Sequence, residues 1–194
     1  KDPHVWMDPA LWRLAISASV EVLAEIDQDG AAVYRRNRDE YFARLEAVAA
    51  YTKAAIGSIP ETSRILVTAH DAFGYFGRRF GIEVLGIQGI STESEAGLHR
   101  VERLVATLVE RRIPAVFIET SVSERNIRAL IEGAAARGHK VRLGGSLYSD
   151  AMGAPGRYEG TYIGMLDHNA TTIARALGGS APEGGMSGFL SHAS

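Results

Sequence analysis

The fold of this chain is decided by residues 65–81, which read ILVTAHDAFGYFGRRFG. The apolar run 65–67 has the length of a buried strand and is too short for a helix. A helical pattern rich in aromatic residues then covers 72–80, and Gly81 follows as a residue type that commonly ends a helix. A buried strand that leads into a helix is the building unit of a parallel α/β sheet.

The same unit recurs along the chain. The predicted strands are 65–67, 84–87, 115–118 and 141–143, and the predicted helices are 72–80, 98–112, 124–137 and 161–177. Strands that alternate with helices imply parallel pairing with right-handed crossovers and helices on both faces of the sheet. We therefore predict the α/β fold class, with a four-stranded parallel sheet flanked by helices over residues 61–178.

Two further helices are predicted before this lobe. Asp8 and Pro9 mark a helix start, because the carboxylate can cap free amides while proline presets the first helical φ angle. The apolar face of this first helix consists of Leu11, Leu14, Ala15, Ala18, Val22 and Ile26. A longer and more polar helix follows over about 31–58, and its length suits a spine or linking helix spanning 30–60.

The composition limits the possible ligands and partners. Lys and Arg total 21 against 23 Asp and Glu among 194 residues, a net charge of −2, so we expect no nucleic-acid partner. The chain has no Cys, which leaves His, Asp and Glu as its strong metal ligands. No apolar run is long enough for a membrane span. The start at Lys1, directly before a motif, leads us to expect a processed or truncated chain, and the Gly- and Ser-rich segment 179–194 predicts a flexible tail.

Potential metal ligands lie at the ends of predicted elements. In α/β sheets ligands gather outside the carboxyl ends of the strands, where His70 and Asp150 are predicted to lie. His4 lies just before the capped helix start. Taken singly, each has an ordinary explanation. His4 could be a packed imidazole, His70 a side chain at a helix start, and Asp150 a turn residue. Together, imidazole and carboxylate groups suit zinc or manganese.

Gln88 follows one predicted strand, and Glu119 ends another that is very apolar. A carboxylate in such a place is costly unless it is paired or hydrogen-bonded. A metal-bound imidazole usually donates its other ring N–H to an oxygen. We therefore expect Glu119 to support a ligand histidine or to anchor a loop, and not to bind the ion itself.

Five segments, in order, carry a resemblance to a known family. They read DPHVWMDP (2–9), TAHDAFGYFGRRFG (68–81), GIQGISTESEAG (86–97), AVFIETS (115–121) and SLYSDAMG (146–153). From residue 2 to 177 the chain resembles the metal-specific solute-binding proteins of ABC importers, the cluster that includes the TroA-like zinc and manganese receptors.

This resemblance implies two α/β lobes joined by a rigid long helix, with one metal ion held between the lobes by four side chains. His4, His70 and Asp150 match three of the four ligands. The lobe that carries the other ligand is not in this chain, so residues 1–29 correspond to a remnant of the N-terminal lobe with its last helix. Residues 30–60 are then the linking helix, and 61–178 the metal-binding C-terminal lobe. A histidine at position 70 favours zinc, with manganese possible.

The implied function is binding, without catalysis: capture of a divalent transition metal and its delivery to an ABC permease. We expect a periplasmic or extracytoplasmic, membrane-associated location, with membrane contact only through the permease or through an N-terminal anchor lost from this chain. Two alternatives stay open. One is a metal-dependent hydrolase with water as the fourth ligand, and the other is an adhesin-type interaction domain with a structural metal, which would serve cell adhesion.

Overall fold

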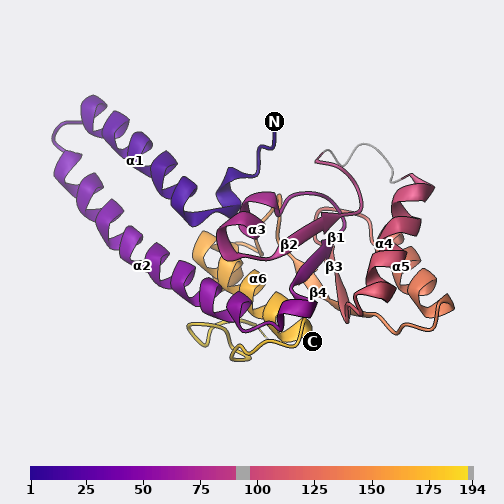
Figure 1. Ribbon diagram of the computed structural model, residues 1–194. Coiled ribbons are helices and arrows are strands. Elements are labelled where there is room, and N and C mark those ends of the chain that lie inside the picture. The colour runs from indigo at the N-terminus through magenta and orange to yellow at the C-terminus, as the bar shows by residue number, and fades with distance from the viewer. Residues whose placement is uncertain (91–96, 192–194) are drawn as a thin grey trace.

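The computed structural model describes residues 1–90 and 97–191. A helical hairpin of α1 (Pro9–Ile26) and α2 (Ala31–Gly57) projects from an α/β lobe (Figure 1). Asp8 starts α1 as predicted, because its Oδ1 accepts a hydrogen bond from the Ala10 amide at 2.8 Å. Within the described residues, none of the helices has the length and apolarity needed to cross a membrane.

The lobe alternates strands and helices in the predicted order, which confirms the α/β class. Its elements are β1 (Ile65–Thr68), α3 (Gly74–Phe80), β2 (Glu83–Gly86), α4 (Leu98–Glu110), β3 (Ala115–Glu119), α5 (Arg125–Ala136), β4 (Arg142–Leu147) and α6 (Tyr162–Ala176). Short 3-10 helices cover Val5–Met7, Glu61–Ser63 and Tyr158–Gly160.

The four strands do not form the single sheet that the sequence predicts. β1 pairs with β2 and β3 pairs with β4, both in parallel, as two separate two-stranded sheets. β1 nevertheless lies beside β3, so the spatial order is β2-β1-β3-β4 (Figure 1). Buried apolar side chains such as Val67 and Phe117 fill the core where the two pairs meet. At the carboxyl edge, the side chain of Glu119 on β3 bonds to the backbone of His70 after β1.

β4 extends beyond the predicted strand 141–143. The prediction ended too early because Gly144 and Gly145 are residue types that are rare inside strands. A Cβ on Gly144 would lie 2.7 Å from the Phe117 ring, and Gly145 has a φ of +139°, so both positions favour glycine. The register between β3 and β4 shifts at this point, between Val116 and Phe117. The extra length carries the strand up to the Asp150 loop.

The hydrophobic core lies between the strands and their helices. Only the C-terminal half of α2 joins it, through residues such as Ala55 and Ile56. A second cluster packs the middle of α2, at Leu45 and Val48, against Leu166 of α6. The start of α2 and the end of α1 therefore form an arm that extends beyond the lobe (Figure 1), while Trp12 near the start of α1 still stacks on Tyr162 of α6.

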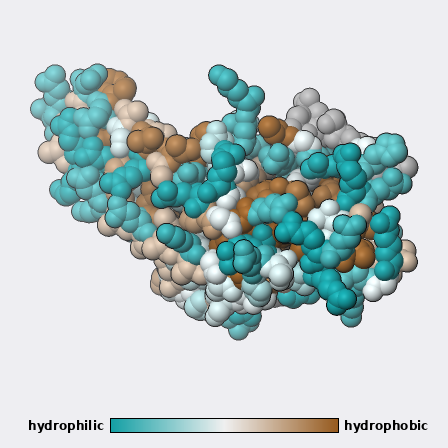
Figure 2. Space-filling view, in the orientation of Figure 1, coloured by the Kyte–Doolittle hydropathy of each residue, from teal (hydrophilic) through white to brown (hydrophobic). Residues whose placement is uncertain are grey.

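The apolar face predicted for α1 is largely exposed. Leu14, Val22 and Ile26 are 66%, 54% and 78% exposed, and Figure 2 shows apolar atoms among the hydrophilic ones along this arm. The pattern correctly predicted the helix, but its buried residues, Pro9 and Ala24, are not on the predicted apolar face.

The C-terminal segment differs from the predicted flexible tail. Up to Ser191 it packs on the lobe, while residues 192–194 lie outside the described residues. The Met186 amide bonds to the buried Asp167 carboxylate, at 2.9 and 3.0 Å from its two oxygens, and Ser191 donates two hydrogen bonds to Glu159. Burial alone would raise the pKa of Glu159, but the bonds from Ser191 lower it. The composition did not predict this packing, because the Gly and Ser content of a segment does not report which of its backbone and side-chain groups contact the lobe.

Candidate metal centre

His70 lies two residues after the end of β1 and is fully buried. Its backbone amide donates to Glu119 Oε1 at 2.9 Å, and its ring Nδ1 lies 2.8 Å from Glu119 Oε2, at an angle too bent for a regular hydrogen bond. Thr68 donates from Oγ1 to the His70 carbonyl at 2.8 Å. Because an ionised carboxylate only accepts hydrogen bonds, it favours the proton on Nδ1 and leaves the lone pair of Nε2 free.

His4 reaches the same place from the N-terminal segment. Its backbone N and ring Nδ1 lie 3.0 and 2.7 Å from Oδ1 of Asp2. Trp6 tethers this segment, since its indole N–H donates to the Ser149 carbonyl at 3.0 Å and its own carbonyl accepts from the Tyr162 hydroxyl at 2.5 Å. The segment is therefore joined both to the Asp150 loop and to α6.

Asp150 stands between the two imidazoles. Its Oδ1 lies 3.2 Å from His4 Nε2, and its Oδ2 lies 3.4 Å from His70 Nε2. One ligand atom from each of the three side chains falls within 4.8 Å of the others. Asp150 is the most accessible of them, with its side chain 38% exposed, whereas both histidines are buried.

The donor set and its spacing fit a zinc-sized ion. Two ligand atoms about 2.0–2.1 Å from zinc at a tetrahedral angle lie about 3.3 Å apart. The two contacts of Asp150, made by its two different oxygens, have this length, while the whole set lies within 4.8 Å and would draw closer around an ion. Among the described residues, the buried Nε2 of His70 has no hydrogen-bond partner. Leaving such an atom unpaired is costly, and a bound cation would satisfy it. Three protein ligands leave one tetrahedral position for another group.

The local charges also favour a cation. Burial alone would lower the pKa of His70, but the contact with Glu119 and the charges of Glu119, Asp150 and Asp71 raise it above its usual value. With neutral imidazoles, three carboxylates surround the two rings: those of Asp2, Glu119 and Asp150. A divalent ion that displaces the proton of His70 enters a site of negative potential.

The structure brings His4, His70 and Asp150 together and places Glu119 beside His70, as expected. Gln88 is not part of the cluster, although its Oε1 is buried without a partner among the described residues. Asp2 is the residue that sequence reasoning missed. The signal was present in the segment DPHVWMDP, where only a proline separates it from His4.

Comparisons with known proteins show the family of this chain. Residues 1–176 match the family model described as zinc-uptake complex component A, periplasmic. The manganese-binding lipoprotein MntA of Bacillus subtilis (strain 168) is 48% identical to this chain, and the zinc-binding protein TroA of Treponema pallidum (strain Nichols) is 46% identical. Both alignments cover 91% of this chain, which spans only 58% and 57% of these relatives.

Solved structures show the same fold. The periplasmic zinc-binding protein TroA from Treponema pallidum matches with a TM-score of 0.87 at 45% identity, covering 91% of this chain and 64% of that one. Fe(III)-bound YtgA from Chlamydia trachomatis matches with a TM-score of 0.84 at 26% identity, covering 92% and 64%. Since the family model covers nearly the whole chain, the chain belongs to the family of the periplasmic component A of zinc-uptake complexes.

Proposed function

We propose that this chain is part of an extracytoplasmic receptor that captures one divalent transition-metal ion and delivers it to an ABC permease. The observation that carries the proposal is the unpaired, buried Nε2 of His70, which faces the Asp150 carboxylate 3.4 Å away. The relatives named above are a zinc-binding protein and a manganese-binding lipoprotein. The proposal covers a protein longer than this chain, because the chain spans less than two thirds of these relatives.

In this proposal the ion is the cargo, and His4, His70 and Asp150 are its ligands. Two imidazoles and one carboxylate favour zinc, suit manganese less well and disfavour calcium and magnesium, which prefer oxygen ligands. Glu119 holds His70 without binding the ion. The protein performs no chemistry on its cargo.

The exposed face of α1 supports a two-lobe arrangement. We assign residues 1–29 to the end of an N-terminal lobe, 30–60 to a linking helix and 61–178 to the metal-binding lobe. A contiguous apolar face of Leu14, Val22 and Ile26 is the kind of surface that another part of a protein covers. The lobe that covers it would supply the remaining ligand and close the site against water.

The receptor would work outside the cytoplasmic membrane, in the periplasm or held at the membrane surface. Its partners are the metal ion and the permease, and nucleic acid is not among them. Membrane attachment would come through the permease or through an N-terminal anchor. The net charge of −2 fits a partner other than a nucleic acid.

Isothermal titration of the chelator-treated chain with zinc, manganese and calcium tests this function. We expect one zinc ion per chain, weaker manganese binding and no measurable calcium binding. His70→Ala should abolish zinc binding. His168→Ala is the matched control, because His168 bonds to the Ser146 carbonyl and is not part of the cluster. Equal zinc binding by both variants would contradict the proposal.

The three-ligand geometry also fits a catalytic zinc, which keeps one open position for water. Incubating the zinc-loaded chain with ester and phosphoester substrates separates the two functions, and we expect no turnover above that of His70→Ala. Removal of the metal tests the adhesin alternative. If the metal were structural, its removal by a chelator would unfold the chain. We expect the chain to stay folded, because the core described above is complete without an ion.

A further inference from the structure

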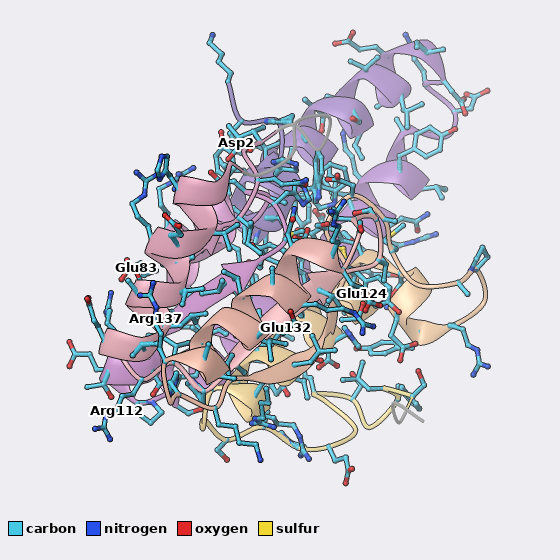
Figure 3. All side chains as sticks on the ribbon, turned by 90° about the vertical axis from the view of Figure 1, so that its right-hand side faces the viewer. Asp2, Glu83, Arg112, Glu124, Glu132 and Arg137 are labelled. Atoms are coloured by element: carbon cyan, nitrogen blue, oxygen red, sulfur yellow. The ribbon has the colours of Figure 1, made fainter. Side chains whose placement is uncertain are left out.

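We propose that Asp2 is a positioning residue for the metal ligand His4, an inference that rests on the proposed metal binding. Asp2 Oδ1 lies 2.7 Å from Nδ1 of His4 and accepts its backbone N–H at 3.0 Å. One carboxylate oxygen therefore fixes both the backbone and the ring of His4. Figure 3 shows Asp2 at the end of the lobe opposite to Arg112, which precedes β3, so Asp2 lies on the side of the carboxyl ends of the strands.

The chemistry of this contact determines which ring nitrogen of His4 can bind a metal. An ionised carboxylate has no proton to donate, so Nδ1 must carry the proton. In the neutral ring Nε2 then bears the lone pair, and this is the nitrogen 3.2 Å from Asp150. Asp2 thus selects the tautomer of His4 that can bind a metal, and it makes the lone pair of Nε2 a stronger ligand for the ion.

A similar pairing occurs on the other side of the site, where Nδ1 of His70 lies 2.8 Å from Oε2 of Glu119, although at a more bent angle. Glu119 supports His70 as Asp2 supports His4, and both unsupported nitrogens point to Asp150. The two supports come from unrelated parts of the fold, the last residue of β3 and the N-terminal segment. Two independent elements thus place a carboxylate oxygen 2.7 or 2.8 Å from Nδ1 of a ligand histidine, which argues that the pairing at Asp2 serves the ligand and is more than a local turn.

The surroundings of Asp2 leave room for this carboxylate. A Cβ on Gly74, the first residue of α3, would lie 3.2 Å from Oδ2 of Asp2. Pro3 separates Asp2 from His4 and restricts the backbone between them. The Asp2 side chain is only 20% exposed, so water does not fully screen its contact with His4.

The test compares Asp2→Ala and Asp2→Asn with Asp39→Ala, which removes the same charge from the exposed surface of α2. The first measurement is the ¹⁵N NMR spectrum of the histidine rings in the metal-free chain, and the second is zinc affinity by competition with a chelating dye. In Asp2→Ala we expect His4 to lose its preference for the Nδ1–H tautomer while His70 keeps its own. Zinc affinity should fall about 10- to 100-fold.

Asp2→Asn retains an oxygen that can accept from Nδ1, so we expect it to restore the tautomer and part of the affinity. The proposal is overturned if Asp2→Ala leaves the His4 tautomer unchanged, or if its zinc affinity equals that of Asp39→Ala. The tautomer measurement needs no metal. A chain that binds no zinc but shows this tautomer change would contradict the proposed function and leave the role of Asp2 in place.

Discussion

The two halves of the metal centre are built in different ways. The His70 half belongs to the core of the lobe: its side chain and that of Glu119 are 0% exposed and lie at the ends of adjacent strands. The other half combines His4, on the N-terminal segment, with the more accessible Asp150, on a loop. The fold itself therefore fixes one half, whereas the other is assembled from segments held by a few hydrogen bonds. Changes in the first half should affect both folding and binding, and changes in the second half should affect binding alone.

The largest difference expected between the two halves of the metal centre is that of Glu119→Ala. It leaves the buried His70 amide without its acceptor, so we expect a loss of about 1–3 kcal/mol in the free energy of unfolding of the metal-free chain. Asp150→Ala is the counterpart in the other half and should change that free energy by no more than about 0.5 kcal/mol. Urea unfolding monitored by circular dichroism measures both. Equal losses would show that the two halves do not differ.

The pH dependence of stability and of zinc affinity should report on the protonation of His70. Its raised pKa means that the folded metal-free chain holds this proton more tightly than the unfolded chain. That contribution to stability is complete below pH about 6.5 and is lost as the pH rises through the higher folded pKa. Zinc needs the neutral ring, so its affinity should follow the opposite trend and fall by up to about tenfold per pH unit below the folded pKa.

Zinc titrations between pH 5.5 and 8 check this, with unfolding of the metal-free chain followed over the same range. The His70→Ala variant should lose the pH-dependent part of the stability, and His168→Ala should keep it. A zinc affinity that stays constant over this range would rule out coordination by His70.

The C-terminal segment tests whether stability and binding can be separated. A Cβ on Gly185 would lie 2.4 Å from Oδ1 of the buried Asp167, whereas one on Gly188 meets nothing within 4 Å, and both residues have a φ of +73°. Gly185→Ala should therefore lower the free energy of unfolding by about 1 kcal/mol more than Gly188→Ala, through loss of the Met186–Asp167 contact. Zinc affinity should be the same in both. A drop in affinity specific to Gly185→Ala would couple this segment to the metal centre.

The smallest effect is expected on the arm. Leu14→Gln replaces an exposed residue of α1, so the midpoint of urea unfolding should correspond to a change within about 0.5 kcal/mol. Leu45→Gln on α2 is the buried counterpart and should be strongly destabilising, because Leu45 packs in the cluster between α2 and α6. Similar losses in the two variants would mean that the α1 face is covered within this chain.

The sequence predicted elements better than their assembly. Apart from β4, the predicted strands and helices of the lobe agree with the structure to within one or two residues, because burial and helical period are local signals. The split into two strand pairs and the docking of Met186 and Ser191 depend on backbone contacts between distant segments, which no local pattern encodes. The same holds for the exposure of α1, since an apolar face shows that a helix is amphipathic and not what covers it.

For the metal centre, position relative to the strands was enough to bring His70, Glu119 and Asp150 to one edge. The place of His4 depended on the family resemblance, because a loop histidine before a helix has no fixed partner in sequence. Asp2 is not marked by any strand end or helix start, because it belongs to the N-terminal segment before the first helix. A carboxylate two residues from a candidate ligand is close enough to reach its ring, so the pair Asp2 and His4 is itself a readable signal.

The place of His4 at the foot of α1 has a mechanical consequence. Only Val5–Met7 and Asp8 separate this ligand from a helix of 18 residues, which extends about 27 Å at 1.5 Å per residue. A tilt of about 5° at the foot of such a lever moves its tip by about 2 Å. The distance between two spin labels, one at the tip of the arm and one on the lobe, would therefore show whether metal binding moves His4, although both labels lie far from the ion.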